Sequence, residues 1–95
     1  MPRAPAALPK EVAAELQRIP GIGRAMAGDL YALGVRRVAD LVAADPQGLY
    51  DRLCKLSGVR QDPCVLYTFR CAVYFARHTD HDPELLKWWN WKDRT

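Results

Sequence analysis

The sequence has no long apolar run, few cysteines and little net charge, and each of these shortages excludes a class of protein. No apolar run approaches the length of a membrane span, and the Pro- and Ala-rich start lacks a signal-peptide core. The three cysteines are odd in number and form no C-x-x-C pair, which favours reduced, mostly buried thiols over a disulfide framework. We therefore expect a cytoplasmic protein without membrane association.

The charge is too weak to be a nucleic-acid signature by itself. The net charge is +3, and the positive excess is shared between both halves of the chain. Any DNA affinity is therefore expected to be modest and salt-sensitive, because it would depend on a few phosphate contacts.

The residue combinations that usually carry catalysis are also missing. We find no nucleophile–base pair, no nucleotide-type Gly-rich loop and no carboxylate pair on an apolar face. The pair His78-x-x-His81 has carboxylates nearby, but Cys71 is a poor third metal ligand, and a polar loop explains these residues more simply. We expect no enzyme, no bound metal at these histidines and no cofactor.

The apolar spacing is helical throughout, and no segment alternates with period two, so the predicted fold is all-α. Three Asp-Pro pairs, at Asp45, Asp62 and Asp82, each join a favoured N-cap to a proline at the first helical position. Residues 1–8 are predicted to be a flexible tail, and residues 9–95 one compact domain of five to six short helices. The expected helices span residues 9–19, 24–33, 36–44, 46–56, 63–77 and 83–91, with Gly34 closing the second and Val38, Leu41 and Val42 facing inward in the third.

The first two predicted helices are joined by a short glycine-containing connection, Ile19-Pro20-Gly21-Ile22-Gly23. Pro20 stops the first helix, and the glycines permit a close turn. Gly23 has no side-chain oxygen to cap the second helix, so its first N–H groups are predicted to remain open to an anion. An ordinary tight turn between antiparallel helices is the alternative interpretation.

The stretch Leu16-x-x-Ile-Pro-Gly-Ile-Gly-x-x-Met-Ala-x-x-Leu30 resembles a helix-hairpin-helix motif, which binds DNA backbones without reading sequence. Roughly residues 9 to 93 resemble the small bacterial pathogenicity-locus proteins, some of which carry a mitomycin-resistance label. The stretches that carry this second likeness are Leu49-Tyr50-Asp51-Arg52-Leu53-Cys54, Cys64-Val65-Leu66-Tyr67-x-Phe69-Arg70-Cys71-Ala72-Val73-Tyr74 and Leu85-Leu86-Lys87-Trp88-Trp89-Asn90-Trp91-Lys92.

The hairpin resemblance implies a phosphate site and a paired architecture similar to the SAM-like folds. The residues expected at the phosphate are Arg18, Gly21, Ile22, Gly23 and Arg24. The resemblance also implies that a monovalent cation can sit on the loop carbonyls, although the sequence leaves this cation open. A second, degenerate hairpin is expected between the fourth and fifth helices, where an Asp-Pro cap replaces the bare glycine and would repel a phosphate.

Further residues near these hairpins are weighed as auxiliary DNA contacts: Arg36, Arg37, Lys55, Arg60 and Trp91. For the cations the alternative is a solvated surface, and for the three tryptophans it is packing against the fifth helix as a C-terminal clasp. The sequence thus predicts a DNA-backbone-binding module for duplex, single-stranded or structured DNA. A helical module that docks an unidentified protein, without binding DNA, is the competing hypothesis.

Overall fold

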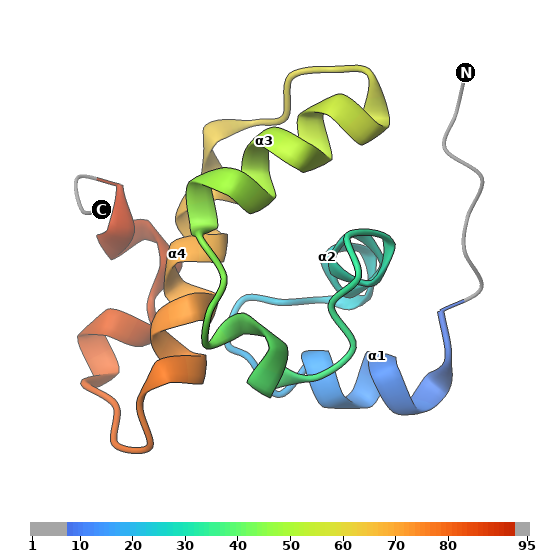
Figure 1. The fold of residues 1–95 in the computed structure, drawn as a ribbon. Helices are drawn as coiled ribbons and strands as arrows, with labels where there is room; N and C mark the ends of the chain where they lie inside the picture. Colours follow the sequence, from blue (N-terminus) through green and yellow to red (C-terminus); the bar gives the residue numbers. More distant parts are fainter. Residues whose placement is uncertain (1–7, 93–95) are drawn as a thin grey trace.

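The computed structural model describes residues 8–92, and within this range it contains four α-helices, three 3₁₀ turns and no strand (Figure 1). The all-α prediction is confirmed. None of the described helices is long and apolar enough to cross a bilayer. In chain order the elements are α1 (Lys10–Leu16), α2 (Arg24–Ala32), η1 (Val38–Leu41), α3 (Pro46–Ser57), α4 (Pro63–Arg77), η2 (Pro83–Leu86) and η3 (Trp88–Trp91).

All three Asp-Pro pairs begin a helical element, as predicted. Asp45 accepts a hydrogen bond from the Gly48 N–H at 3.2 Å, and Asp62 accepts one from the Cys64 N–H at 2.8 Å. Asp82 does the same for η2. These aspartates satisfy backbone donors that a helix start leaves unpaired, while the following proline has no N–H to satisfy.

The predicted count of five to six helices is not confirmed, because two of the expected helices are 3₁₀ turns. In the segment 36–44 only η1 is helical, since the Asp40 carboxylate accepts from the N–H groups of both Arg36 and Arg37 and holds the chain extended before the turn. Val42, which was expected to face inward, follows that turn and is 47% exposed. Leu41 is fully buried, as expected.

The first and last predicted helices are also shorter than expected. The α1 helix ends at Leu16 rather than Ile19, because the N–H groups of Arg18 and Ile19 bond to carbonyls three residues back instead of four. The segment 83–91 is broken at Lys87, whose backbone is extended, into η2 and η3. Of the predicted N-terminal tail, residues 1–7 lie outside the described residues, and Leu8 packs against the core.

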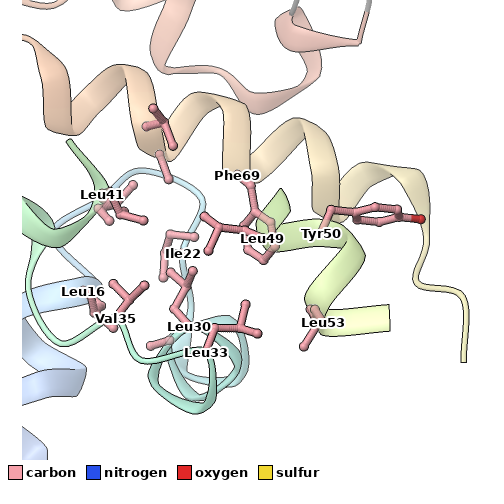
Figure 2. Close-up of a cluster of buried hydrophobic side chains, with 14 residues drawn as sticks. Leu16, Ile22, Leu30, Leu33, Val35, Leu41, Leu49, Tyr50, Leu53 and Phe69 are labelled. Carbon is pink, nitrogen blue, oxygen red and sulfur yellow. The ribbon is translucent and has the colours of Figure 1, made fainter. Parts of the chain in front are cut away.

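One hydrophobic core joins the helices, and Figure 2 shows Phe69 pointing from α4 into it beside Leu49 of α3. Leu16 of α1 and Leu30 of α2 are fully buried in the same cluster. Ile22, from the loop between α1 and α2, enters it as well. The buried Ile22 side chain therefore fixes the loop between the first two helices to the core.

Of the three cysteines, which are all free, only Cys71 is buried, so the expectation of mostly buried thiols is wrong. Cys54 is half-buried and Cys64 is exposed at the start of α4. The hydrogen bond to the Asp62 carboxylate raises the pKa of the Cys64 thiol and so opposes thiolate formation at this helix start.

Candidate functional site

The loop between α1 and α2, defined here as the Gly21–Gly23 hairpin, has an inner and an outer side. Ile19 and Ile22 are buried in the core, and the Ile22 N–H donates to the Ile19 carbonyl at 3.1 Å. Gly21 and Gly23 lie on the exposed side. Gly21 has φ +86°, a conformation that favours glycine. The apolar residue between the two glycines thus anchors the loop and turns both glycines toward solvent.

The N-terminus of α2 is uncapped. Gly23 precedes the helix with extended backbone and gives no side-chain hydrogen bond, and the first intrahelical bond runs from the Ala27 N–H to the Gly23 carbonyl at 2.9 Å. Within residues 8–92, no acceptor is bonded to the N–H groups of Gly23, Arg24 or Ala25. All three residues are exposed. This end of the helix therefore presents free donors at the positive end of the helix dipole.

The set of free donors differs from the predicted set at two positions. The Ile22 N–H, expected to face a phosphate, is used inside the loop by the Ile19 carbonyl, and that carbonyl is correspondingly less available to a cation. The Ala25 N–H, which the sequence analysis did not single out, is open. Counting from the uncapped Gly23 into the first helical turn would have identified it.

The C-terminal segment supports one side of the hairpin. A Cβ atom built on Gly21 would lie 3.4 Å from Trp88 Cδ1 and 3.6 Å from Thr68 Cγ2, whereas one built on Gly23 would meet no described atom within 4 Å. Gly21 therefore sits against α4 and η3, and Gly23 faces open space. No local sequence signal indicated the contact with Trp88.

The two arginines beside the hairpin differ in their partners. Arg18 forms an ion pair with Glu15 at 2.9 Å, and Glu15 also accepts from the Val38 N–H. The Val38 and Arg18 hydrogen bonds lower the pKa of the Glu15 carboxyl. Arg24 is exposed and forms no ion pair with any of residues 8–92. Of the two, Arg24 is the cation left available beside the free amides.

Arg36 and Arg37 lie on the exposed segment after α2. The Arg36 guanidinium lies 5.3 Å from the centre of the Tyr31 ring, and Arg37 lies 3.7 Å from the Asp40 carboxylate. The hydrogen bond from the Arg36 N–H is the largest cause of the lowered pKa of Asp40. Both arginines therefore have neighbours of their own and also remain accessible to solvent.

The connection between α3 and α4 differs chemically from the first hairpin. Gly58 closes α3 with φ +75°, and four residues later Asp62 caps α4. The Cys64 N–H bond lowers the pKa of the Asp62 carboxyl, so its negative charge is held at the position where an anion would approach. Lys55 and Arg60 are exposed and line a shallow surface hollow beside this connection.

The remaining candidate residues lie around the far end of α4. The Trp91 indole donates to the Leu85 carbonyl at 2.8 Å, and its ring lies 5.5 Å from that of Tyr74. The His81 ring stacks on Phe75 with centroids 4.6 Å apart. Among residues 8–92, no group of three or more His, Cys, Asp or Glu side chains is placed to hold a metal.

Comparison with known proteins identifies the family. A family model described as "Pathogenicity locus" matches residues 9–95. The chain belongs to this family. A curated relative, the mitomycin resistance protein McrB of Streptomyces lavendulae, is 32% identical over 77 residues, which cover 81% of this chain and 70% of the relative. No solved structure matches this pathogenicity-locus chain.

Proposed function

We propose that this pathogenicity-locus protein is a non-enzymatic DNA-backbone-binding module of the helix-hairpin-helix class. The observation that carries the proposal is the exposed, uncapped N-terminus of α2, with the free N–H groups of Gly23, Arg24 and Ala25. Backbone donors at the positive end of a helix dipole bind phosphate oxygens without reading bases. Binding would therefore be independent of sequence.

The surroundings of the hairpin leave room for an anion as large as phosphate at the uncapped start of α2. No described atom lies within 4 Å of the Cβ position of Gly23, so a phosphate can approach the amides. Arg24 adds a positive charge next to them without a competing carboxylate among residues 8–92. Arg36 and Arg37 are proposed as weaker, auxiliary contacts, with Lys55, Arg60 and Trp91 as more distant candidates.

The second hairpin, which is the connection between α3 and α4, is proposed not to bind DNA. Its helix, α4, begins with a proline that has no N–H and with an aspartate that already accepts from the Cys64 N–H. The architecture would then be a paired helix-hairpin-helix unit in which only the first copy holds a phosphate. One competent hairpin implies weak binding with a shallow dependence on salt.

The decisive experiment measures fluorescence anisotropy with duplex, single-stranded and junction DNA at several salt concentrations. Gly23→Asp supplies a side-chain cap with a negative charge, so it should weaken DNA binding at least about tenfold while keeping or slightly raising helix stability. Gly28→Asp makes the same charge change inside α2 and should weaken binding much less. Gly23→Ala leaves the amides open and should bind like the unmodified protein, because its Cβ meets no described atom.

Either of two results would contradict the proposal. If the unmodified protein shows no salt-dependent binding at low ionic strength, or if Gly23→Asp and Gly28→Asp bind alike, the hairpin is not a phosphate site. Circular dichroism of each variant separates loss of the site from loss of the fold.

The second candidate function is a protein-interaction module without DNA binding. It is favoured by the large apolar side chains exposed at the C-terminal side of α3 and on η3, namely Leu56 at 46%, Val59 at 61% and Trp89 at 55%. Absence of DNA binding, together with a partner protein that co-purifies and is lost in a Leu56→Ser, Val59→Ser double variant, would support this candidate instead.

A further inference from the structure

A cleft beside α4, which shares no lining residue with the hairpin, contains two arginines and three aromatic rings. Its volume is about 370 Å³, within the lower range of small-molecule sites, and it is lined by residues 43–46 and by Arg70, Val73, Tyr74, Arg77, His78 and Trp91. Figure 1 shows the segment between η1 and α3 running along α4, with the C-terminal turns also packed beside that helix. The cleft thus has α4 as its floor and two other segments as its walls.

The two arginines hold those walls in place. Arg77 donates through Nε to the Val42 carbonyl at 2.8 Å and through Nη2 to the Ala44 carbonyl at 3.2 Å. Arg70 donates through Nη1 to the Trp91 carbonyl at 2.9 Å. Since a guanidinium has five N–H donors in a rigid fork, each arginine is fixed by some donors and keeps others.

The charge in the cleft is positive and uncompensated by ion pairs. Neither Arg70 nor Arg77 pairs with a carboxylate among residues 8–92. Asp45 is the one carboxylate in the lining, and its oxygen accepts from the Gly48 N–H as the cap of α3. The cleft therefore has two positive charges and one negative charge, and the carboxylate that carries the negative charge already accepts a hydrogen bond. This excess of positive charge favours an anion, and phosphate matches the planar donors of the guanidinium groups.

Beside small aliphatic residues, the lining also contains three flat aromatic rings. The rings of Tyr74 and Trp91 lie 5.5 Å apart, and the ring of His78 lies 4.7 Å from that of Tyr74. Flat rings next to cationic donors suit a ligand that joins a phosphate to a planar heterocycle. We propose that this cleft binds a small phosphate monoester carrying a planar base, that is, a free nucleoside monophosphate. The site shares no residue with the hairpin, so each proposal can fail alone.

The test is an NMR titration of the full chain with adenosine 5′-monophosphate, adenosine and inorganic phosphate. We expect the monophosphate to shift the amide signals of residues 43–46 and the side-chain Nε signals of Arg70 and Arg77, and to bind more tightly than adenosine or phosphate alone. Shifts confined to other parts of the molecule, or equal binding of phosphate and the monophosphate, would overturn the proposal.

Variants assign the effect to the arginines. Arg70→Gln and Arg77→Gln should each weaken binding about tenfold, because each removes a charge-assisted hydrogen bond. The matched control is Arg52→Gln, since Arg52 also donates to a backbone carbonyl, that of Leu33 at 2.9 Å, but lies outside the cleft. That control should bind the monophosphate as the unmodified chain does.

Asp45→Asn keeps the proposal testable if the arginine variants lose their fold. It preserves an oxygen for the Gly48 N–H and removes the only carboxylate of the described lining, so it should tighten binding of the monophosphate severalfold. Unchanged or weaker binding in this variant, with the helix content retained, would contradict an anion site.

Discussion

At the scale of single residues, the two glycines of the hairpin are there for different physical reasons. Gly21 has a positive φ, which residues with a side chain rarely adopt, so the conformation of the turn itself favours glycine. Gly23 has φ −90°, a value that any residue can adopt, and no described atom lies within 4 Å of its Cβ position. What glycine contributes at position 23 is the absence of a cap, which leaves the α2 amides free.

This difference predicts that the same substitution lowers stability at one glycine and leaves it nearly unchanged at the other. Gly21→Ala should lower the free energy of unfolding by roughly 1–2 kcal/mol, because alanine is strained at positive φ. Gly23→Ala should change it by less than about 0.5 kcal/mol. Urea denaturation of the two variants checks this, and equal losses would show that position 23 is structurally required after all.

A second residue-scale prediction concerns pH. Burial raises the pKa of the Cys71 thiol from 9.0 to about 11, and the thiol donates to the Leu85 carbonyl. Between those values the unfolded chain loses this proton while the folded protein keeps it, so the contribution of Cys71 to stability is full below pH 9 and falls as pH rises. The loss should reach about 1 kcal/mol near pH 10.

Chemical denaturation at several pH values measures this loss. Cys71→Ala removes the titrating thiol, so the stability of this variant should fall less steeply above pH 9 than that of the unmodified chain. Parallel pH profiles for the two proteins would contradict the assigned shift, since the other titrating groups are common to both.

At the scale of elements, the molecule contains two kinds of helix start. The α2 helix begins on a bare glycine, whereas α3, α4 and η2 each begin on an aspartate that accepts a backbone N–H. The α1 helix also lacks a side-chain cap, but of the two hairpin helices α2 and α4, only α2 leaves exposed donors at the positive end of its dipole. The proposal that the first hairpin binds phosphate and the second does not depends on this single difference in capping.

Removing the cap of α4 should therefore create a second phosphate site. Asp62→Gly is expected to raise DNA affinity a few-fold and to cost less than about 1 kcal/mol of stability. Anisotropy titrations measure the change, and Asp82→Gly, which removes a capping aspartate of η2 with the same change in net charge, is the control. An intact Asp62→Gly variant that binds DNA no better than Asp82→Gly would show that the cap is not what silences this hairpin.

The same scale shows where sequence prediction works and where it does not. The starts at Pro46, Pro63 and Pro83 were predictable because an Asp-Pro cap acts within about three residues. The segment 36–44 was not, because the Asp40 side chain bonds two preceding backbone N–H groups and competes with a regular helix. The first hairpin was predicted in position, but the use of the Ile22 N–H inside the loop was not.

At the scale of the whole molecule, the C-terminal turns connect regions that are distant in the sequence. Trp88 reaches Gly21, Trp91 lies against Tyr74, and Arg70 donates to the Trp91 carbonyl. The sequence predicted that the tryptophans would pack on the longest helix, because a small domain needs its large side chains. It could not predict that one of them supports the hairpin, since no local pattern encodes a contact between opposite ends of a chain.

The contact between Trp88 and the hairpin predicts a coupling between the C-terminal segment and DNA binding. Trp88→Ala should lower the free energy of unfolding by roughly 2–4 kcal/mol, because a half-buried indole leaves a void beside Gly21 and Thr68. It should also weaken DNA binding severalfold at temperatures where the variant remains folded, because the loop that orders the α2 amides loses its support. Trp89→Ala is the matched control, since that ring is 55% exposed and lies next to Trp88 rather than against the loop. Denaturation and anisotropy should therefore both distinguish the two variants. If Trp88→Ala loses stability but binds DNA as the unmodified chain does, the segment serves the fold alone, and the hairpin orders its donors without it.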